Sequence, residues 1–190
     1  VMAEDSGQTV LAGLDGHILP LIDHIIPQLE TGIGVADIGC GKAQVLLQLA
    51  SCYPNSDFTG FDLSAEALAE ASLQADIAGL TNIQFEARDL SDFEDTADTE
   101  RFDFVTAFDA VHDQAVPQGV LNGIYKTLKN GGTFLMQDIR ASSHLENNLE
   151  HPIAPLLYTL STMHCMTVSL AQGGAGLGTM WGEELAVEML

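Results

Sequence analysis

The feature that most constrains this 190-residue chain is a glycine-rich turn between an apolar strand and a helix. Residues 35–43 read VADIGCGKA, and residues 61–64 read FDLS. Gly39 lets the backbone turn sharply, and Gly41 leaves room for a ligand to approach the main chain. Such a turn, followed about twenty residues later by a strand that ends in a carboxylate, is typical of a nucleoside pocket at the carboxyl edge of a parallel sheet.

Strand-like and helix-like segments alternate along the chain, which predicts an α/β fold with a doubly wound, mostly parallel sheet. The predicted strands cover residues 34–38, 57–62, 83–87, 102–108 and 133–139. The predicted helices cover residues 8–30, 42–52, 65–78 and 117–128, and residues 129–132 (KNGG) predict a tight turn into the fifth strand. In the remainder we expect a loop with a short helix over 141–156, helices over 158–170 and 181–190, and a glycine-rich loop over 172–178.

The composition predicts a packed acidic domain that does not bind nucleic acid. The net charge is −21, while a hydrophobic content of 46% argues against disorder. Six scattered Lys and Arg residues stand against 27 carboxylates, which would repel a polyanion. We see no run long enough to span a bilayer and no signal segment, so no membrane partner is expected. Cys40, Cys52 and Cys165 lack metal-ligand spacing, which favours a reduced, cytoplasmic protein without a metal.

The residues around the turn favour S-adenosylmethionine over a dinucleotide as the ligand. The dinucleotide fingerprint G-x-G-x-x-G requires glycine at position 44, where this chain has Gln44. Asp37 either orders the loop or attracts the cationic amino group of methionine. Asp62 is placed to hold a ribose, and its alternative role is a helix cap near Ser64.

Polar residues also follow the third and fourth strands. Asp89 follows the third strand, where a carboxylate can meet an adenine amino group. The fourth strand leads to Asp109, His112 and Asp113 at the same edge. His112 is a base, a substrate contact or a helix cap. Asp109 and Asp138 end neighbouring strands as metal ligands do, but strand-end capping explains both.

These motifs together resemble class I S-adenosylmethionine-dependent methyltransferases over about residues 10–140. The matching segments read VADIGCG, FDLS, ARDL, FDFVTAFDAVHDQ and LKNGGTFLM. Residues 108–114 and 164–170 are more narrowly similar to a bacterial subgroup that joins a winged-helix region to the methyltransferase domain and is labelled transcriptional-regulator-like.

The resemblance implies a sheet order of 3-2-1-4-5 and a set of cofactor contacts. The glycine-rich loop is assigned to the methionine end of the cofactor, the ends of the second and third strands to its ribose and adenine, and the end of the fourth strand to its sulfonium. The residues assigned to the cofactor are Asp37, Gly39, Cys40, Gly41, Asp62, Leu63, Asp89, Leu90, Phe108 and Asp109. One domain is expected over 1–190, with a helical segment at 1–33, a cofactor core at 34–140 and a truncated substrate-side cover at 141–190.

Two departures from the family pattern stand out. Ala43 replaces a third glycine of the turn, and the sequence ends at Leu190 before the sixth and seventh strands that the family has. It also starts at Val1 with no winged-helix segment, so we expect a fragment of a longer protein.

The predicted activity is methyl transfer to a small-molecule acceptor. The protein has to hold a nucleophile close to the methyl carbon, and a hydroxyl acceptor also needs a base. Candidate bases are His112, Asp113 and His164, although ordinary helix packing is the favoured explanation of His164. The alternatives are a non-enzymatic cofactor sensor within a transcriptional regulator and an NAD-binding oxidoreductase. Whether the chain forms a homodimer is left open by the sequence.

Overall fold

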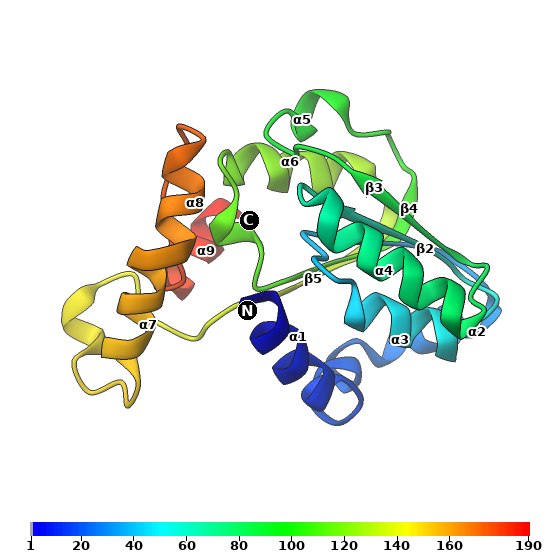
Figure 1. Cartoon of the computed structure of the whole chain (residues 1–190), viewed down its shortest axis with the longest axis horizontal. Helices are drawn as coiled ribbons and strands as arrows, with labels where there is room; N and C mark the ends of the chain where they lie inside the picture. The colour runs from blue at the N-terminus through cyan, green and yellow to red at the C-terminus, as the bar shows by residue number, and fades with distance from the viewer. Residues whose placement is uncertain (1) are drawn as a thin grey trace. The chain divides into compact units, whose positions relative to one another are not determined.

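The computed structural model describes residues 2–190, with side chains from residue 8 onward. Five strands form one sheet in the order β3-β2-β1-β4-β5 (Figure 1). Their bounds are Gly34–Ile38 for β1, Asp57–Asp62 for β2, Ile83–Ala87 for β3, Phe102–Phe108 for β4 and Leu128–Gln137 for β5. The predicted fold class and strand order are confirmed.

The chain divides into two compact units, and each is described by itself. Unit 1 contains the chain through Asp89 together with residues 98–108 and 126–136. Unit 2 contains residues 90–97, 109–125 and 137–190. The predicted division into segments 1–33, 34–140 and 141–190 stays a prediction.

The centre of the sheet is strand β1, which pairs in parallel with β2 on one side and β4 on the other. Val35, Ala36 and Ile38 are fully buried, as expected for a parallel strand covered on both faces. Because β2 and β4 lie on opposite sides of β1, the chain reverses its direction of winding there. Ligands of open α/β sheets bind at the carboxyl ends of the strands at such a switch point.

The N-terminal segment of unit 1 is helical, as predicted, but it is not one regular helix. It consists of α1 (Met2–Gly13), a π-helix η1 (Leu14–Ile18), a 3-10 helix η2 (Leu19–Ile25) and α2 (Ile26–Thr31). Ile22 has non-helical angles (φ −127°, ψ 38°), and prolines stand in the first turn of η2 and of α2. Proline lacks an amide hydrogen, so each one removes a helical hydrogen bond where a longer helix would need it.

The expectation that no run is long enough to span a bilayer is wrong by length and composition. Gln8–Thr31 contains a window with a mean hydropathy of 1.3 and is long enough to cross a membrane. In the structure part of this segment joins the core of unit 1, where Val10, Leu14, Ile25 and Leu29 are buried, while Leu21 is 74% exposed.

Helices α3 (Gln44–Cys52) and α4 (Ala65–Ala78) follow β1 and β2 and lie beside each other on the sheet (Figure 1). Ser64 caps α4, because its Oγ accepts a hydrogen bond from the Ala67 amide at 3.2 Å. The helix ends at Gly79, whose φ of 68° suits glycine. Both helices begin at the carboxyl edge of the sheet.

The fifth strand differs from its prediction. Helix α6 (Pro117–Thr127) runs directly into β5, and the predicted turn at 129–132 is part of the strand. Gly131 takes a φ of +80° within it, and Lys129 Nζ bonds Asp103 Oδ2 of β4 at 2.8 Å. The Lys129 side chain therefore ties the start of β5 to β4.

Unit 2 contains mostly short helices. They are α5 (Phe93–Thr96), η3 (Val111–Asp113), η4 (Leu145–Asn148), α7 (Ala154–Leu160), η5 (Ser161–Cys165), α8 (Met166–Ala171) and α9 (Glu183–Met189). The helical prediction for 158–170, the loop at 172–178 and the short helix within 141–156 are confirmed.

Candidate functional site

The glycine-rich turn after β1 is tied to the neighbouring strand β2. The amides of Gly39 and Cys40 both donate to the carbonyl of Phe61, at 2.8 and 3.0 Å. Gly39, Gly41 and Ala43 have φ values of 72°, 53° and 52°, in the left-handed region. The loop therefore makes a tight reversal whose shape glycine favours at two positions and alanine tolerates at the third.

Asp62 at the end of β2 links this loop to the next helix. Its Oδ2 accepts from the Gly41 amide at 2.7 Å, and its Oδ1 accepts from the Ser64 amide at 2.8 Å. Each carboxylate oxygen can accept more than one hydrogen bond, so both keep capacity for the hydroxyls of a ribose. Leu63, the next residue, exposes 58% of its surface and offers an apolar face beside the carboxylate.

Asp37 at the end of β1 is only 4% exposed. Thr106 Oγ1 of β4 donates a hydrogen bond to its Oδ1 at 2.8 Å. Burial raises the pKa of Asp37 to about 7, the Thr106 hydrogen bond lowers it in part, and the negative charge of Asp62 raises it. Burial also raises the pKa of the Cys40 thiol, and the charges of Asp37 and Asp62 add to this, which disfavours the reactive thiolate form.

The other predicted cofactor residues lie on both units. In unit 1, Asp89 is exposed beyond β3, and Phe108 packs against the core at the end of β4. Leu90, which is buried, and Asp109 belong to unit 2. Asp109 has a φ of +52°, and its amide donates to the carbonyl of Gln137 at 2.8 Å.

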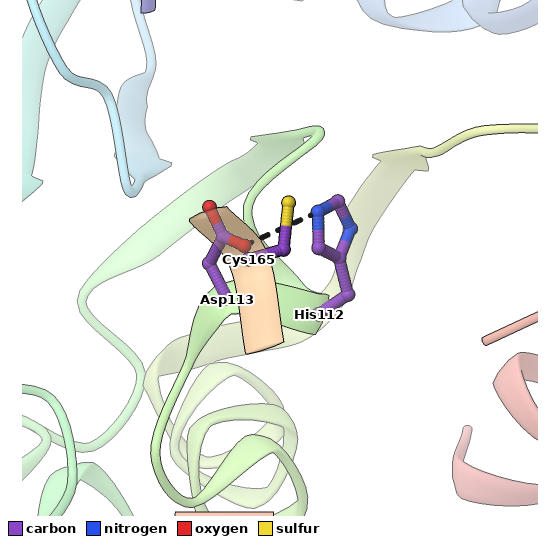
Figure 2. Close-up of side chains that lie close together, drawn as sticks. All are labelled: His112, Asp113 and Cys165. Carbon is purple, nitrogen blue, oxygen red and sulfur yellow. Dashed lines mark ion pairs between the residues drawn. The ribbon is translucent and has the colours of Figure 1, made fainter. Parts of the chain in front are cut away.

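A cluster of charged side chains surrounds His112 in unit 2. The ring is 1% exposed, and its Nδ1 lies 3.0 Å from both carboxylate oxygens of Asp138. Its Nε2 lies 3.3 Å from Asp113 Oδ1 and 3.3 Å from Thr179 Oγ1. Figure 2 shows Cys165 beside His112 and Asp113. The Sγ of Cys165 lies 2.9 Å from Thr179 Oγ1.

This environment stabilises the protonated ring of His112. Burial alone lowers its pKa, but hydrogen bonds to Asp138 and Cys165 and the charges of Asp138 and Asp113 raise the pKa to about 11. The ring is therefore a hydrogen-bond donor at neutral pH. Of the three predicted bases, His112 and Asp113 lie together. His164 is half-buried in η5. The residue of that helix that contacts His112 is Cys165.

The partners of these residues have only weak signals in the sequence. Thr106 and Thr179 were not predicted as site residues, because threonine within a strand or a loop carries no motif. Asp138 was recognised only as a strand-end residue, and its pairing with His112 depends on how the chain folds back over 26 positions.

A family described as a methyltransferase domain matches residues 29–184. This range includes Asp37, Asp62 and the residues around His112. The chain belongs to this class I S-adenosylmethionine-dependent methyltransferase family. S-adenosylmethionine is the methyl donor that the family implies.

Two curated relatives of this methyltransferase-family chain act on small molecules by name. It is 31% identical over 110 residues to the mitochondrial ubiquinone biosynthesis O-methyltransferase of Candida albicans. The matched region covers 58% of this chain and 33% of that protein. It is 30% identical over 109 residues to the fatty-acid O-methyltransferase of Mycolicibacterium smegmatis, and the matched region covers 57% of this chain and 38% of that protein. The chain thus spans about a third of the length of these relatives.

The fold of this family member is also found among solved structures. The BH2331 protein of Bacillus halodurans matches with a TM-score of 0.64 at 22% identity, over 87% of this chain and 63% of that one. This similarity supports the Rossmann-like fold.

Proposed function

We propose that this chain binds S-adenosylmethionine at the carboxyl edge of unit 1 and transfers its methyl group to a small molecule. The observation that carries the proposal is the hydrogen bond from the Gly41 amide to Asp62 Oδ2 at 2.7 Å. This bond joins the two sequence motifs that the cofactor requires, and it holds the loop in place before any ligand arrives.

The chemistry of the side chains in unit 1 fits the cofactor. Asp62 would accept from the ribose hydroxyls, the exposed face of Leu63 would cover the adenine, and Asp89 would accept from the adenine amino group. Asp37 would face the ammonium of the methionine moiety. A nearby cation favours the charged carboxylate, so binding would lower the raised pKa of Asp37.

Cys40, Gly39 and Gly41 would surround the methionine portion of the cofactor with main chain, and Phe108 would lie beside the sulfonium. Leu90 and Asp109 belong to unit 2, and their assignment to the cofactor stays a prediction from the sequence. When bound, S-adenosylmethionine supplies an electrophilic methyl group. The task of the protein is to orient the acceptor and exclude water.

We further propose that the acceptor is a small molecule rather than a nucleic acid. The net charge of −21 and the six cationic side chains support this, because phosphate neutralisation needs Lys and Arg. The curated relatives named above are by name a ubiquinone biosynthesis O-methyltransferase and a fatty-acid O-methyltransferase, and both names indicate small-molecule acceptors.

Among the candidate bases, His112 suits the role poorly. A base must accept a proton near neutral pH, and the ion pairs of His112 keep its ring protonated. Asp113, whose Oδ1 lies 3.3 Å from the Nε2 of that ring, stays a prediction as a base. His164 stays a prediction, as does the narrower resemblance to transcriptional-regulator-like members with a cofactor-sensing role.

Titration calorimetry with S-adenosylhomocysteine tests the cofactor site. We expect a dissociation constant of about micromolar order, and Asp62→Ala should weaken binding by about tenfold or more, equal to about 1.4 kcal/mol. The control is Asp57→Ala, which removes an exposed carboxylate from the opposite end of the same strand. Equal affinity of Asp62→Ala and Asp57→Ala, or tighter binding of NAD than of S-adenosylhomocysteine, would contradict the proposal.

A further inference from the structure

The cluster around His112 contains donor atoms of three chemical kinds that converge on one point in unit 2. They are the imidazole Nε2 of His112, the carboxylate Oδ1 of Asp113 and the thiol Sγ of Cys165 (Figure 2). We propose that these three side chains form a zinc-binding site, and that Asp138 positions the ring of His112 from behind.

The distance between the nitrogen and oxygen donors suits a tetrahedral ion. The three donor atoms all lie within 4.8 Å of one another, and Nε2 is 3.3 Å from Asp113 Oδ1. Bonds of about 2.0 Å from a tetrahedral zinc to nitrogen and oxygen place those two ligands about 3.3 Å apart. Thr179 Oγ1 lies 3.3 Å from Nε2 and 2.9 Å from Sγ. The fourth ligand of the ion would be either this hydroxyl or a water molecule.

The donor set selects zinc over the common hard cations. Thiolate and imidazole bind zinc well, whereas magnesium and calcium prefer sites made of oxygen alone. The other ring nitrogen, Nδ1, lies 3.0 Å from both oxygens of Asp138. A carboxylate on the second nitrogen of a ligating histidine fixes the ring orientation and is the usual outer partner of a zinc ligand.

Burial separates this site from a surface group of acidic residues. His112 is 1% exposed and Cys165 3% exposed, so their donor atoms are held inside the unit. The Asp113 Oδ1 atom is itself buried, yet it accepts no hydrogen bond from any residue that the structure describes. The Asp113 side chain is 28% exposed overall, which gives an ion a way in from solvent.

The same burial argues against a second interpretation of the cluster. A cysteine next to a histidine that is paired with an aspartate is also the pattern of a nucleophilic triad. A nucleophile has to reach its substrate, however, and the Cys165 side chain is enclosed. A metal ion needs only the donor atoms.

Binding balances the charges of the buried cluster. The incoming Zn²⁺ replaces the proton on Nε2 of the imidazolium and the proton of the thiol, and both protons leave to solvent. Two positive charges enter and two leave, so the total charge of the cluster does not change. The ion would connect η3 to η5 and hold these helices together.

Cobalt substitution tests the proposal directly on the intact chain. Chelator-treated protein receives one equivalent of Co²⁺ in a large excess of Mg²⁺, which blocks weak sites on the acidic surface. We expect a thiolate-to-cobalt charge-transfer band in the near ultraviolet that one equivalent of Zn²⁺ removes. Cys165→Ser should abolish the band, while Cys52→Ser, which changes an exposed cysteine, should leave it intact.

A zinc competition assay adds two further variants. Asp113→Asn removes a ligand at a partly exposed position, and Asp138→Asn removes the outer partner of the ring; both should weaken zinc binding by about tenfold or more. The proposal is overturned if wild-type protein shows no thiolate band, or if Cys165→Ser binds cobalt unchanged. Asp62→Ala should retain full zinc affinity, so a failed cofactor site and a failed zinc site give different results.

Discussion

At the scale of single residues, the most unusual group in unit 1 is the buried carboxyl of Asp37. It lies at the end of the central strand, where water is excluded and its one described hydrogen bond comes from Thr106. Desolvation raises its pKa from 3.8 to about 7. A buried acid of this kind makes stability depend on pH in a direction that can be worked out.

Asp37 has a pKa of 3.8 in the unfolded chain and of about 7 in the folded protein. Between these two values it destabilises the fold increasingly as the pH rises. The folded state then holds a proton that the unfolded state has released, so the free energy of unfolding falls up to about pH 7 and is level above it. Asp37→Asn removes this titration and keeps an acceptor for Thr106. Between about pH 5 and about pH 8, urea unfolding should show the stability of the variant rising relative to the wild type by up to about 3 kcal/mol. A stability difference that is equal at both pH values would refute this.

Gly60 in β2 leaves no room for a side chain. A Cβ atom at this position would lie 2.8 Å from Cys40 Sγ and 2.9 Å from Phe85 Cδ1. Gly60→Ala should therefore lower the free energy of unfolding by about 1–3 kcal/mol and disturb the glycine loop as well. Gly34→Ala is the matched control in β1, since its nearest neighbour atom lies at 3.4 Å. Denaturant unfolding of both variants gives the comparison, and equal losses would contradict the packing argument.

At the scale of elements, the regular parts of the sheet were predictable and the irregular ones were not. Strands β1 to β4 match their predicted bounds, because buried parallel strands appear as short apolar runs between turn residues. The start of β5 was missed, since Lys129 and Gly131 predict a turn unless the pairing with β4 is known. The change of helix type between α1 and α2 was also missed, because apolar periodicity does not distinguish an α-helix from π and 3-10 turns.

The cap of α4 gives a prediction at this scale. Ser64 Oγ accepts from the Ala67 amide, so one of the unpaired amides of the first turn is satisfied. Ser64→Ala should cost about 1 kcal/mol of stability. Ser72→Ala, at an exposed position within the same helix, should change stability little or increase it, because alanine favours helices. Thermal unfolding followed by circular dichroism measures both, and a larger loss for Ser72→Ala would rule out the cap as the cause.

At the scale of the whole molecule, the sequence predicted the cofactor loop better than the residues near His112. The loop motif is local, and Asp62 is recognisable because strand-end carboxylates have a fixed place in this fold. The cluster around His112 depends on residues 26 and 67 positions away, whose meeting no short motif records. Cys165 and Thr179 acquire their roles from tertiary structure alone.

The net charge of −21 makes the stability of the molecule depend on salt. Carboxylates repel one another more strongly in the compact state than in the unfolded chain, and dissolved ions screen this repulsion. Raising NaCl from about 0.05 M to about 0.5 M should therefore raise the melting temperature. Calorimetry in buffers of constant pH measures this. A falling melting temperature would mean that attractive ion pairs such as Lys42–Glu70 dominate instead.

The contacts of His112 also bear on the order in which the protein folds. The bonds to Asp138 and Thr179 close loops of 26 and 67 residues, and closing long loops costs entropy that has to be recovered by later contacts. The cluster should then assemble after the rate-limiting step, once the sheet has formed. Substitutions at Thr179 would in that case speed unfolding and leave the folding rate nearly unchanged, so the contacts of this cluster would lengthen the lifetime of the native state.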